Sequence, residues 1–307
     1  MGKLETVKWL WKNNKHGFIT VVWAKVAKTG IFNNMADEKY LKLSYWMHMG
    51  KRLNLDNPVT YNEKLQWLKL YDRKPVYTML VDKYEVRKHI KDVIGKEYLI
   101  PLLGVWENAE EIDFESLPEQ FVVKCTHDSK SAIICKDKTC FSAEEARKKL
   151  RKALNRNLFY WSREWPYKDC KPRVIAEKYI EDSNGGLNDY KFFCFNGKAD
   201  NVMVVAGRAI GDSKFYHFDK DWNILRYNRL GRSLPDGFKI PRPDNMDELF
   251  SVAEKLSEGL PEIRIDLYDV DGKIYFGEYT FFNESGYETG FDYESDKHLG
   301  DLIVLPE

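Results

Sequence analysis

The chain has 307 residues, enough for one large unit or roughly two to three small lobes around a shared cleft. Hydrophobic residues make up 43% of it and aromatic residues 14%, which is sufficient for a substantial core. The 48 basic and 48 acidic residues cancel, and this balance argues against a specialised DNA- or RNA-binding protein, which would carry a basic excess. We therefore expect no nucleic-acid partner.

The five cysteines do not indicate disulfides. They form no C-x-x-C pair, and their odd number leaves one over. Cys125, Cys135 and Cys194 lie in apolar stretches, which indicates buried free thiols in a reducing compartment. No histidine lies at ligand spacing from them, so a zinc site is not expected. The pattern predicts a cytoplasmic protein.

Residues 1–35 are predicted to form an amphipathic helical segment. The apolar stretch 17–27 is shorter than the roughly 20 residues that a membrane-spanning helix needs, and no small-residue cleavage site of a signal peptide follows it. Two interpretations stay open: a helix packed on the body, and an anchor resting on the inner membrane face. The residues that favour the anchor are Trp9, Trp11, Trp23, Lys3, Lys8, Lys12, Lys15, Lys25 and Lys28.

Helical patterns come next along the chain. Residues 37–48 are predicted to form one helix. Thr60 and Glu63 form a capping box that begins a second helix, which ends near Tyr71. Asp82 is predicted to cap a third helix, whose apolar residues recur on one face.

Short strands then alternate with two further helices. Asn196-Gly197 marks a tight hairpin, and Ser142 with Glu145 forms a second capping box. The expected strands are 121–124, 132–135, 173–180, 190–195, 202–206, 214–218, 263–270 and 273–281, and the expected helices are 142–154 and 245–258. Several hairpins mixed with helices predict an α+β fold, not a parallel doubly wound sheet.

The last predicted hairpin carries several charged residues. Alternation places Arg264 and Asp266 on one face of its first strand, while Glu278 and Thr280 share a face of the second. A two-residue loop would put Asp266 and Glu278 on opposite faces. A three-residue loop, 270–272, would put them on the same face.

We favour the three-residue loop, because Gly272 suits its left-handed position. Arg264 is then expected opposite Glu278, with Asp266 diagonal to it. Two carboxylates on facing strands are a natural platform for Mg²⁺, which takes one or two carboxylates together with phosphate oxygens. A cross-strand salt bridge between Arg264 and Glu278 explains the same pattern equally well.

Polar residues also surround the turn 126–131. The preceding strand delivers Lys124 to this turn, and a lysine beside several free N–H groups can bind phosphate. The GxxxxGK[ST] pattern of a Walker loop is absent. Because a lone lysine at a strand end is more often an ordinary surface side chain, this motif does not decide the function by itself.

Three further stretches hold candidate binding residues. The strand that ends in residues 177–180 could offer backbone edges and an apolar wall to a nucleotide base, although an internal strand is the simpler explanation in isolation. Asp189 and Lys191 share one face of the next strand. Asp82-Lys83 lies at a predicted helix start, where anions bind well.

The order of these motifs resembles that of the ATP-grasp superfamily. More narrowly, the chain is similar to its TupA-like group, which is linked to teichuronopeptide and capsular polysaccharide synthesis. The resemblance extends from about residue 40 to residue 305. It is carried by the stretches NLDNPVTYNEKLQWLKLYDR, DKYEVRKHI, FVVKCTHDS, RVIAEKYIED, DYKFFCFNGK and RIDLYDVDGKIYFGEYTF.

The resemblance implies ATP and Mg²⁺ as cofactors. Lys83 and Lys124 match the two lysines that hold ATP phosphates, and the turn 126–131 matches the loop that closes over them. Residues 177–180 match the hinge that binds adenine through its backbone, and Asp189 matches the acid that bonds the ribose hydroxyls. The implied ATP-binding residues are Lys83, Lys124, Thr126, Ser129, Ser131, Glu177, Lys178, Tyr179, Ile180, Asp189 and Lys191.

The resemblance also implies a metal and catalytic set. Asp266 and Glu278 match metal-bridging carboxylates, and Arg264 matches an arginine near the transferring phosphate. The family often has Asn where this chain has Thr280, so Thr280, Asn283 or water is the third metal ligand. The loop also departs from the family, because His127-Asp128-Ser129-Lys130 contains no glycine.

The implied fold is two α+β lobes that clasp ATP, preceded by the helical segment. The implied division is an N-terminal amphipathic segment, an N-terminal helical/α-β lobe, a small lobe with the phosphate-covering loop, and a C-terminal lobe with the metal site. These cover residues 1–35, 36–115, 116–180 and 181–307 respectively.

The implied activity is a carboxylate–amine ligase of bacterial cell-surface or capsular polysaccharide synthesis, which joins an amino acid or amine to a uronic acid. Lys124, Arg264 and Arg208 are the expected catalytic residues. Arg208 is a candidate for holding an anionic substrate, as are Arg229 and Arg232, which surface positions explain equally well. A sugar kinase and a glycosyltransferase remain alternatives. A non-catalytic ATP-binding protein does not account for Lys83, Lys124, Asp266 and Glu278 together.

Overall fold

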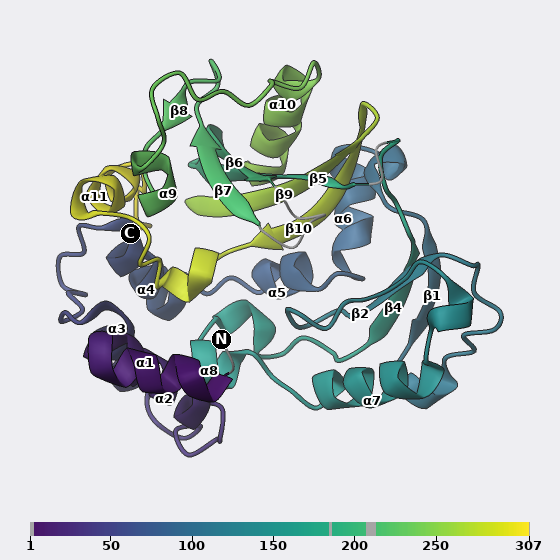
Figure 1. Ribbon diagram of the computed structural model, residues 1–307, viewed down its shortest axis with the longest axis horizontal. Coiled ribbons are helices and arrows are strands. Elements are labelled where there is room, and N and C mark those ends of the chain that lie inside the picture. The colour runs from purple at the N-terminus through teal and green to yellow at the C-terminus, as the bar shows by residue number, and fades with distance from the viewer. Residues whose placement is uncertain (1–2, 184–185, 207–212, 307) are drawn as a thin grey trace.

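Two antiparallel sheets form the centre of the protein, in a computed structural model that describes residues 3–183, 186–206 and 213–306 (Figure 1). The smaller sheet has the strand order β1-β4-β2-β3, and the larger has the order β10-β9-β5-β6-β7-β8. The strands are β1 (Leu102–Trp106), β2 (Phe121–Cys125), β3 (Ile133–Cys135), β4 (Val174–Lys178), β5 (Asn188–Phe195), β6 (Lys198–Ala206), β7 (Lys214–Phe218), β8 (Ile224–Leu225), β9 (Glu262–Val270) and β10 (Lys273–Thr280).

Helices surround both sheets. The α-helices are α1 (Lys3–Asn13), α2 (Lys15–Ala27), α3 (Asp37–Met49), α4 (Tyr61–Tyr71), α5 (Val76–Val81), α6 (Val86–Val93), α7 (Ala143–Leu154), α8 (Phe159–Ser162), α9 (Arg229–Arg232), α10 (Met246–Ser257) and α11 (Tyr293–Asp301). The predicted mixture of helices and antiparallel hairpins is confirmed. The predicted capping box is present, since Thr60 accepts from the Glu63 amide and the Glu63 carboxylate accepts from the Thr60 amide.

The predicted helix start at Asp82 is wrong. The Asp82 carboxylate accepts hydrogen bonds from the amides of Tyr84 and Glu85, at 2.8 and 3.1 Å, and so forms a local turn. α6 therefore begins at Val86. Lys83 consequently lies in the connection between α5 and α6 and not at a helix N-terminus.

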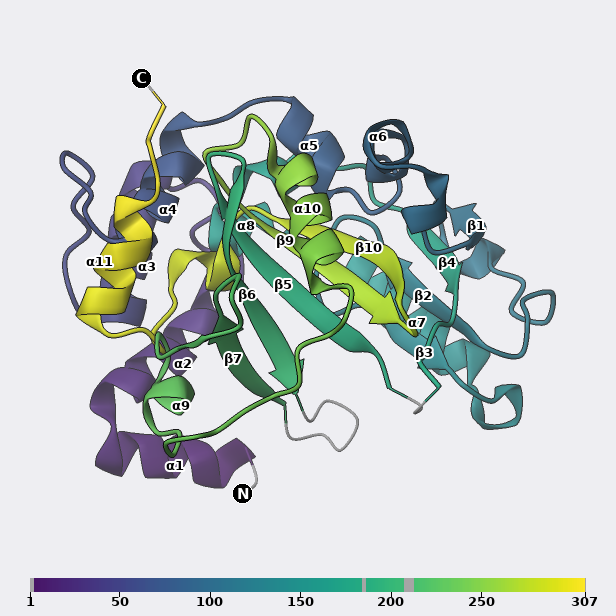
Figure 2. The same cartoon turned by 90° about the horizontal axis from the view of Figure 1, so that it is seen from above.

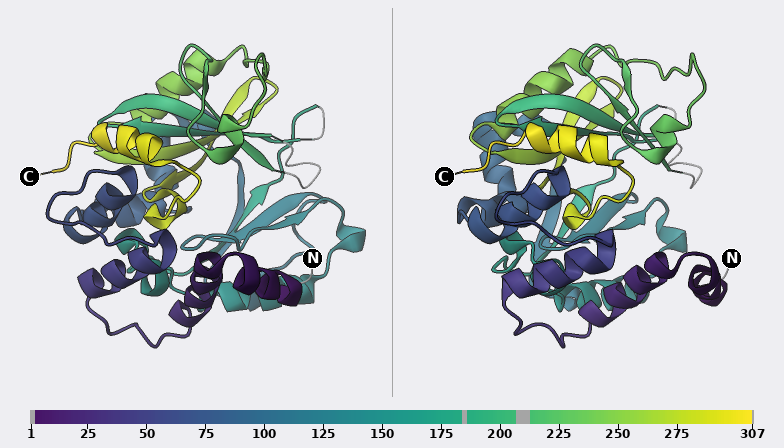
Figure 3. Two further views of the ribbon diagram at one scale, coloured as in Figure 1. Left: turned by 60° about the vertical axis from the view of Figure 1, so that its left-hand side comes forward. Right: turned by 90° about the vertical axis from the view of Figure 1, so that its left-hand side faces the viewer.

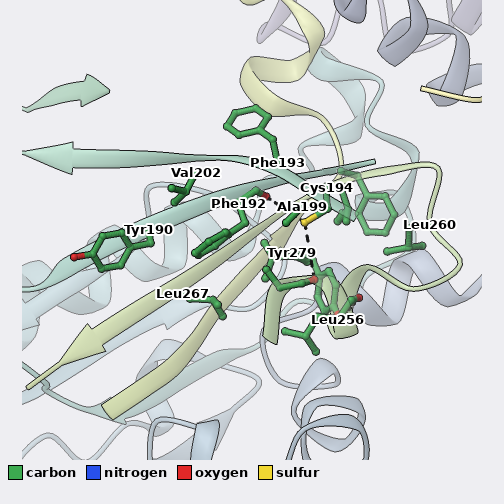
Figure 4. Packing of buried hydrophobic residues seen from close by; sticks show 14 of the residues in the cluster. Tyr190, Phe192, Phe193, Cys194, Ala199, Val202, Leu256, Leu260, Leu267 and Tyr279 are labelled. Atoms are coloured by element: carbon green, nitrogen blue, oxygen red, sulfur yellow. Dashed lines mark hydrogen bonds between the residues drawn. The ribbon is translucent and has the colours of Figure 1, made fainter. Parts of the chain in front are cut away.

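The larger sheet holds the main core. α10 covers its outer face, with Phe250 packed edge to face on Phe192 of β5 at 5.0 Å (Figure 2). Figure 4 shows Phe192, Leu267 and Tyr279 within this cluster, and the Tyr279 hydroxyl donates to the Leu256 carbonyl at 3.0 Å. Alternate residues of β9 and β10 are buried on the side of the sheet that α10 covers. The opposite faces of these two strands can therefore carry charged side chains.

The smaller sheet has a separate core, which includes Phe121 of β2 and Leu150 of α7. The two sheets thus pack against different helices and are set apart from one another in Figure 3. The predicted free thiols are confirmed, since Cys125, Cys135 and Cys194 are buried and unbonded to one another.

The N-terminal segment packs partly on the body. Trp23 of α2 is buried between Phe32 and Tyr40, and its Nε1 donates to Ser44 Oγ at 3.1 Å. The side chains of Trp9 and Trp11 remain 52% and 59% exposed. Within the described ranges, no helix has the length and apolar character needed to cross a bilayer.

Glu262 should make stability depend on pH. This residue of β9 is buried and accepts a hydrogen bond from the Tyr61 hydroxyl at 2.8 Å, and burial raises the pKa of its carboxyl from 4.5 to about 8. The native state therefore holds the proton more tightly than the unfolded chain. Stability present at low pH is lost as pH rises from about 4.5 to about 8, at up to about 1.4 kcal/mol per pH unit.

We expect Glu262→Gln to flatten this dependence, because its amide cannot ionise. The check is the free energy of unfolding in urea, measured at several pH values across that window for both proteins. Parallel pH profiles for wild type and variant would show that Glu262 does not hold a proton in the folded state.

Candidate active site

The β9–β10 hairpin turns more tightly than the sequence suggested. Val270 pairs with Lys273, so the loop contains only Asp271 and Gly272. Their φ angles are 51° and 84°, the left-handed pair that a two-residue hairpin turn favours. The predicted three-residue loop is wrong.

A β-bulge at Gly277 nevertheless brings the two carboxylates together. The register shifts between Phe276 and Glu278, so that Glu278 lies directly opposite Asp266. Without the shift, the two-residue loop would leave Glu278 on the other face of the sheet. The predicted shared face is therefore confirmed, but a bulge produces it, as bulges often do beside active sites.

The partners across the hairpin differ from those predicted. Arg264 lies opposite Thr280, and the expected pairing with Glu278 is wrong. The guanidinium instead binds Asp266 on its own strand, with Nε to Oδ1 at 2.7 Å and Nη2 to Oδ2 at 2.9 Å. Glu278 is thus left facing the space between the two sheets, with its side chain 38% exposed.

Gly277 should be required for this geometry. A Cβ at this position would lie 2.9 Å from the Asp266 carbonyl oxygen and 3.2 Å from the Tyr268 ring. We expect Gly277→Ala to shift the strand and to reduce the ATP turnover that the sequence resemblance implies by about tenfold or more, because small displacements of reacting groups have large effects. Turnover is measured as ADP release.

Gly272→Asn is the matched control in the same hairpin. A Cβ at Gly272 would meet no atom within 4 Å, and Asn tolerates positive φ well. The ADP release of this variant should match that of the wild type. Equal ADP release from Gly277→Ala and wild type would show that the bulge does not set the site.

Arg264 organises the end of the hairpin. It is 9% exposed, and Nη2 also donates to Thr280 Oγ1 at 3.0 Å while Nη1 donates to Asn283 Oδ1 at 2.6 Å. One guanidinium therefore holds Asp266 and both residues expected to supply a third metal ligand. This fork geometry is specific to arginine.

Two lysines complete the charge around the carboxylates. Lys191 of β5 binds both Asp189 and Asp266, and Lys83 Nζ lies 3.3 Å from Glu278 Oε2.

These cations keep both carboxyls ionised. Burial opposes ionisation of Asp266, but Arg264 and Lys191 outweigh it and lower the pKa of the carboxyl. Partial burial likewise opposes ionisation of Glu278, but Lys83 outweighs it, and the pKa is lowered. Both groups are carboxylates at neutral pH.

These carboxylates fit a nucleotide-bound magnesium ion. Asp266 and Glu278 face each other and present the hard oxygen ligands that Mg²⁺ prefers. Across the described part of the chain, no group of three or more His, Cys, Asp or Glu side chains is arranged to hold a metal ion. One or two carboxylates with phosphate oxygens and water are the usual ligands of Mg²⁺ at ATP sites.

A cleft of about 290 Å³ lies between the two sheets, beside this hairpin. The smaller sheet contributes the end of β4 and the turn after β2, and the larger sheet contributes β10. The predicted residues that line the cleft are Lys83, Lys124, Ser129, Ser131, Glu177, Lys178, Tyr179, Ile180 and Glu278. Residues from four predicted motifs thus meet in one cleft.

Lys124 is held by an ion-pair network that the sequence did not reveal. Its Nζ lies 2.7 Å from Glu177 Oε2, and Arg87 Nη1 lies 2.9 Å from Glu177 Oε1. Glu177, expected to act through its backbone, therefore uses its side chain to position Lys124. Arg87 was missed because it lies on α6, far from β4 in sequence, and no local motif marks it.

Hydrogen bonds fix the turn 126–131 at several points. Ser131 Oγ donates to Asp128 Oδ1 at 2.5 Å, and Lys83 Nζ donates to the Asp128 carbonyl at 2.9 Å. Thr126 lies apart from the cleft, with its hydroxyl donating to the Lys171 carbonyl at 3.4 Å. Ser129 and Lys130 are exposed and lie over the cleft. They are the part of the turn that can contact a phosphate.

The remaining predicted residues that the structure describes lie outside this cleft. Asp189 and Lys191 lie in β5 beside Asp266, and Lys191 pairs with Asp266 in register. Arg229 and Arg232 belong to α9, where Arg232 binds Asp292 at 3.1 Å and neither residue lines the cleft. Arg208 lies outside the described residues.

Comparisons with known proteins place the chain in a family. The family model described as "TupA-like ATPgrasp" matches residues 63–304. No curated protein matches.

Among solved structures, the chain is similar to three ligases. D-alanine–D-alanine ligase from Helicobacter pylori has 18% identity and a TM-score of 0.42, over 79% of this chain and 69% of that one. The Bacillus anthracis D-alanine–D-alanine ligase complexed with ATP has 17% identity and a TM-score of 0.44, over 73% and 65%. L-amino acid ligase from Bacillus licheniformis has 13% identity and a TM-score of 0.43, over 73% and 49%. The chain thus spans about two thirds of the first two ligases and about half of the third.

The family match, rather than these distant similarities, carries the assignment. It covers well over half of the chain and includes every residue that lines the cleft. The ATP-grasp fold expected from the sequence is thereby confirmed, and the protein belongs to the TupA-like ATP-grasp family.

Proposed function

We propose that the protein is an ATP- and Mg²⁺-dependent carboxylate–amine ligase that joins an amino acid or amine to a uronic acid during bacterial cell-surface or capsular polysaccharide synthesis. The observation that carries the proposal is the meeting of two cavities. The cleft described above shares Ser129, Lys130 and Glu278 with a second cavity of about 630 Å³. A nucleotide in one and a second substrate in the other would meet at Glu278.

The reaction has two steps. An oxygen of the substrate carboxylate attacks the γ-phosphorus of ATP, the bond to the β-phosphate oxygen breaks, and an acyl phosphate and ADP form. The amine nitrogen then attacks the acyl carbon, phosphate leaves with the bonding electron pair, and the nitrogen loses a proton. Phosphoryl transfer of this kind depends mainly on positioning and charge neutralisation.

The chain's own residues would supply both the positioning and the charge neutralisation. Lys83 and Lys124 would bind the phosphates, exchanging their present partners Glu278 and Glu177 for phosphate oxygens. Asp266 and Glu278 would hold Mg²⁺, with Thr280 or Asn283 as a further ligand. The ion would supply charge neutralisation at the phosphates.

Arg264 would place positive charge near the transferred group, since it lines the second cavity next to Glu278. Residues 177–180 would border the adenine, and Asp189 would contact the ribose. Ser129 and Lys130, between the two cavities, would exclude water from the acyl phosphate.

ADP release from Mg-ATP tests the proposal, with uronic acids and amino acids offered separately and together. We expect rapid release only when both a carboxylate and an amine are present, with an amide as product. Release with a sugar alone and accumulation of a phosphorylated sugar would instead identify a kinase. Binding of a UDP-sugar without ATP turnover would identify a glycosyltransferase.

We further propose that residues 1–35 contact the inner membrane face. This segment contains six lysines and one acidic residue, and Trp9, Trp11 and Ile31 are exposed, Ile31 at 73%. Exposed tryptophans with lysines suit the surface of an anionic bilayer.

Sedimentation with lipid vesicles tests this contact. The wild type should bind phosphatidylglycerol vesicles and leave phosphatidylcholine vesicles unbound at moderate salt. Replacing Trp9 and Trp11 together by Ser should abolish binding, whereas Trp46→Ser, an exposed tryptophan of α3, should not. Equal binding by all three proteins would contradict the proposal.

A further inference from the structure

The second cavity is built largely from elements that precede or flank the nucleotide cleft. One wall is α2 with Lys28, another is the segment 156–167 around α8, and the third is the end of β10 with the turn that follows. The matched family region begins at residue 63, so α2 lies ahead of it. The volume of about 630 Å³ is within the range of pockets that enclose a drug-sized ligand.

We infer that this cavity binds the body of an anionic saccharide, with Trp161 as a stacking surface and Lys28 as the contact for an anionic group. The inference rests on the proposed ligase function and adds to it the place and the residues that select the carboxylate substrate. The saccharide's reacting carboxylate would lie toward Arg264 and Glu278, and its further rings would extend toward α2.

Aromatic side chains dominate the lining. Trp161 is half-buried, and the buried rings of Trp23, Tyr167, Phe282 and Tyr287 surround the same space. Flat aromatic faces offer large apolar contact at low entropic cost, and they suit the C–H faces of a pyranose ring. A free amino acid with an aliphatic or charged side chain offers no comparable ring face.

The cations of the cavity favour a negatively charged ligand. Lys28, Lys130 and Arg156 line it and are exposed, so they can turn toward a ligand. Lys28 Nζ lies 5.8 Å from the centre of the Trp161 ring. Two acids line the cavity away from the hairpin. Glu284 is exposed, whereas Glu164 accepts a hydrogen bond from Ser285 Oγ at 2.5 Å and burial raises the pKa of its carboxyl.

The backbone of Trp161 is held against α3. Its carbonyl accepts a hydrogen bond from the Tyr40 hydroxyl at 2.7 Å. Close by, the fully buried Arg163 donates to the Phe32 carbonyl at 2.8 Å and pairs with Asp37 at 3.1 Å. A binding surface fixed by such contacts loses little entropy when a ligand binds. The N-terminal segment is thus part of the site's support.

Calorimetric titration with trigalacturonate, in the presence of ADP and Mg²⁺, tests the inference. Maltotriose is the neutral control ligand. We expect trigalacturonate to bind and maltotriose to bind at least about tenfold more weakly. Trp161→Ala should weaken trigalacturonate binding about tenfold or more, as removal of a central tryptophan usually does. Lys28→Met should weaken it severalfold and reduce its dependence on salt.

Two matched variants control for general damage. Trp46→Ala removes an exposed tryptophan of α3, and Lys25→Met removes an exposed lysine of α2 outside the cavity. Both should bind trigalacturonate as the wild type does, and ADP affinity should be the same in all variants. Unchanged trigalacturonate binding in Trp161→Ala and Lys28→Met, equal binding of maltotriose, or no binding of trigalacturonate would overturn the inference.

The same variants separate this inference from the ligase proposal. If trigalacturonate binds through Trp161 but wild-type ADP release never depends on a carboxylate, the saccharide site stands and the ligase proposal fails. If the ligase works but Trp161→Ala raises the KM of the amine instead of that of the uronate, the ligase stands and the saccharide assignment fails.

Discussion

Glu278→Gln is expected to reduce ADP release by at least about 100-fold, the scale seen when one preorganised charge-stabilising group is removed. Glu278 faces Asp266 across the bulged hairpin, lines both cavities and is one of the two carboxylates proposed to hold Mg²⁺. The amide keeps the shape of the side chain but removes the charge. It also leaves Lys83 without its carboxylate partner.

The loss should be catalytic and not structural. Because the Glu278 side chain is 38% exposed and pairs with a single lysine, its replacement should change the free energy of unfolding by about 1 kcal/mol or less. Glu254→Gln on α10, remote from the cleft, is the matched control and should release ADP normally. Near-normal turnover in Glu278→Gln, with normal affinity for Mg-ATP, would remove this carboxylate from the mechanism.

Arg264→Met is expected to lose both activity and stability. The guanidinium is 9% exposed and donates to Asp266, Thr280 and Asn283, so methionine would leave buried acceptors without a donor. Breaking one side of a buried ion pair typically costs about 3–5 kcal/mol. Urea unfolding measures the stability, and ADP release measures the activity.

Two variants make this result specific. Arg264→Lys keeps the charge but not the fork, and it should recover part of the stability while turnover stays low. Arg242→Met removes an arginine that pairs with exposed Asp247, and it should cost about 1 kcal/mol or less. Equal stability losses in Arg264→Met and Arg242→Met would contradict the role given to Arg264.

Local signals predicted the elements well. The capping box at Thr60 begins α4, and the Asn196-Gly197 turn joins β5 to β6, because both depend on residues adjacent in sequence. The bulge at Gly277 was not predicted. Gly277 permits the bulge because it has no Cβ and can lie close to the Asp266 backbone. This contact exists only once β9 and β10 pair.

Long-range contacts account for the other differences at the site. Glu177 binds Lys124 and Arg87 through its side chain, and these three residues come from β4, β2 and α6. Their pairing follows from how the strands order in the sheet, which the sequence does not reveal locally. The contribution of α2 to the second cavity depends likewise on its packing beside α8.

Transfer of labelled oxygen tests the central claim most directly. A uronate with ¹⁸O at both oxygens of its carboxylate is incubated with Mg-ATP, the amine and the protein, and the released phosphate is analysed by mass spectrometry. In the proposed mechanism a carboxylate oxygen attacks the γ-phosphorus and leaves with phosphate when the amine attacks. We predict one ¹⁸O atom in each phosphate released; phosphate free of ¹⁸O, formed at the rate of ADP, would contradict the acyl-phosphate ligase account.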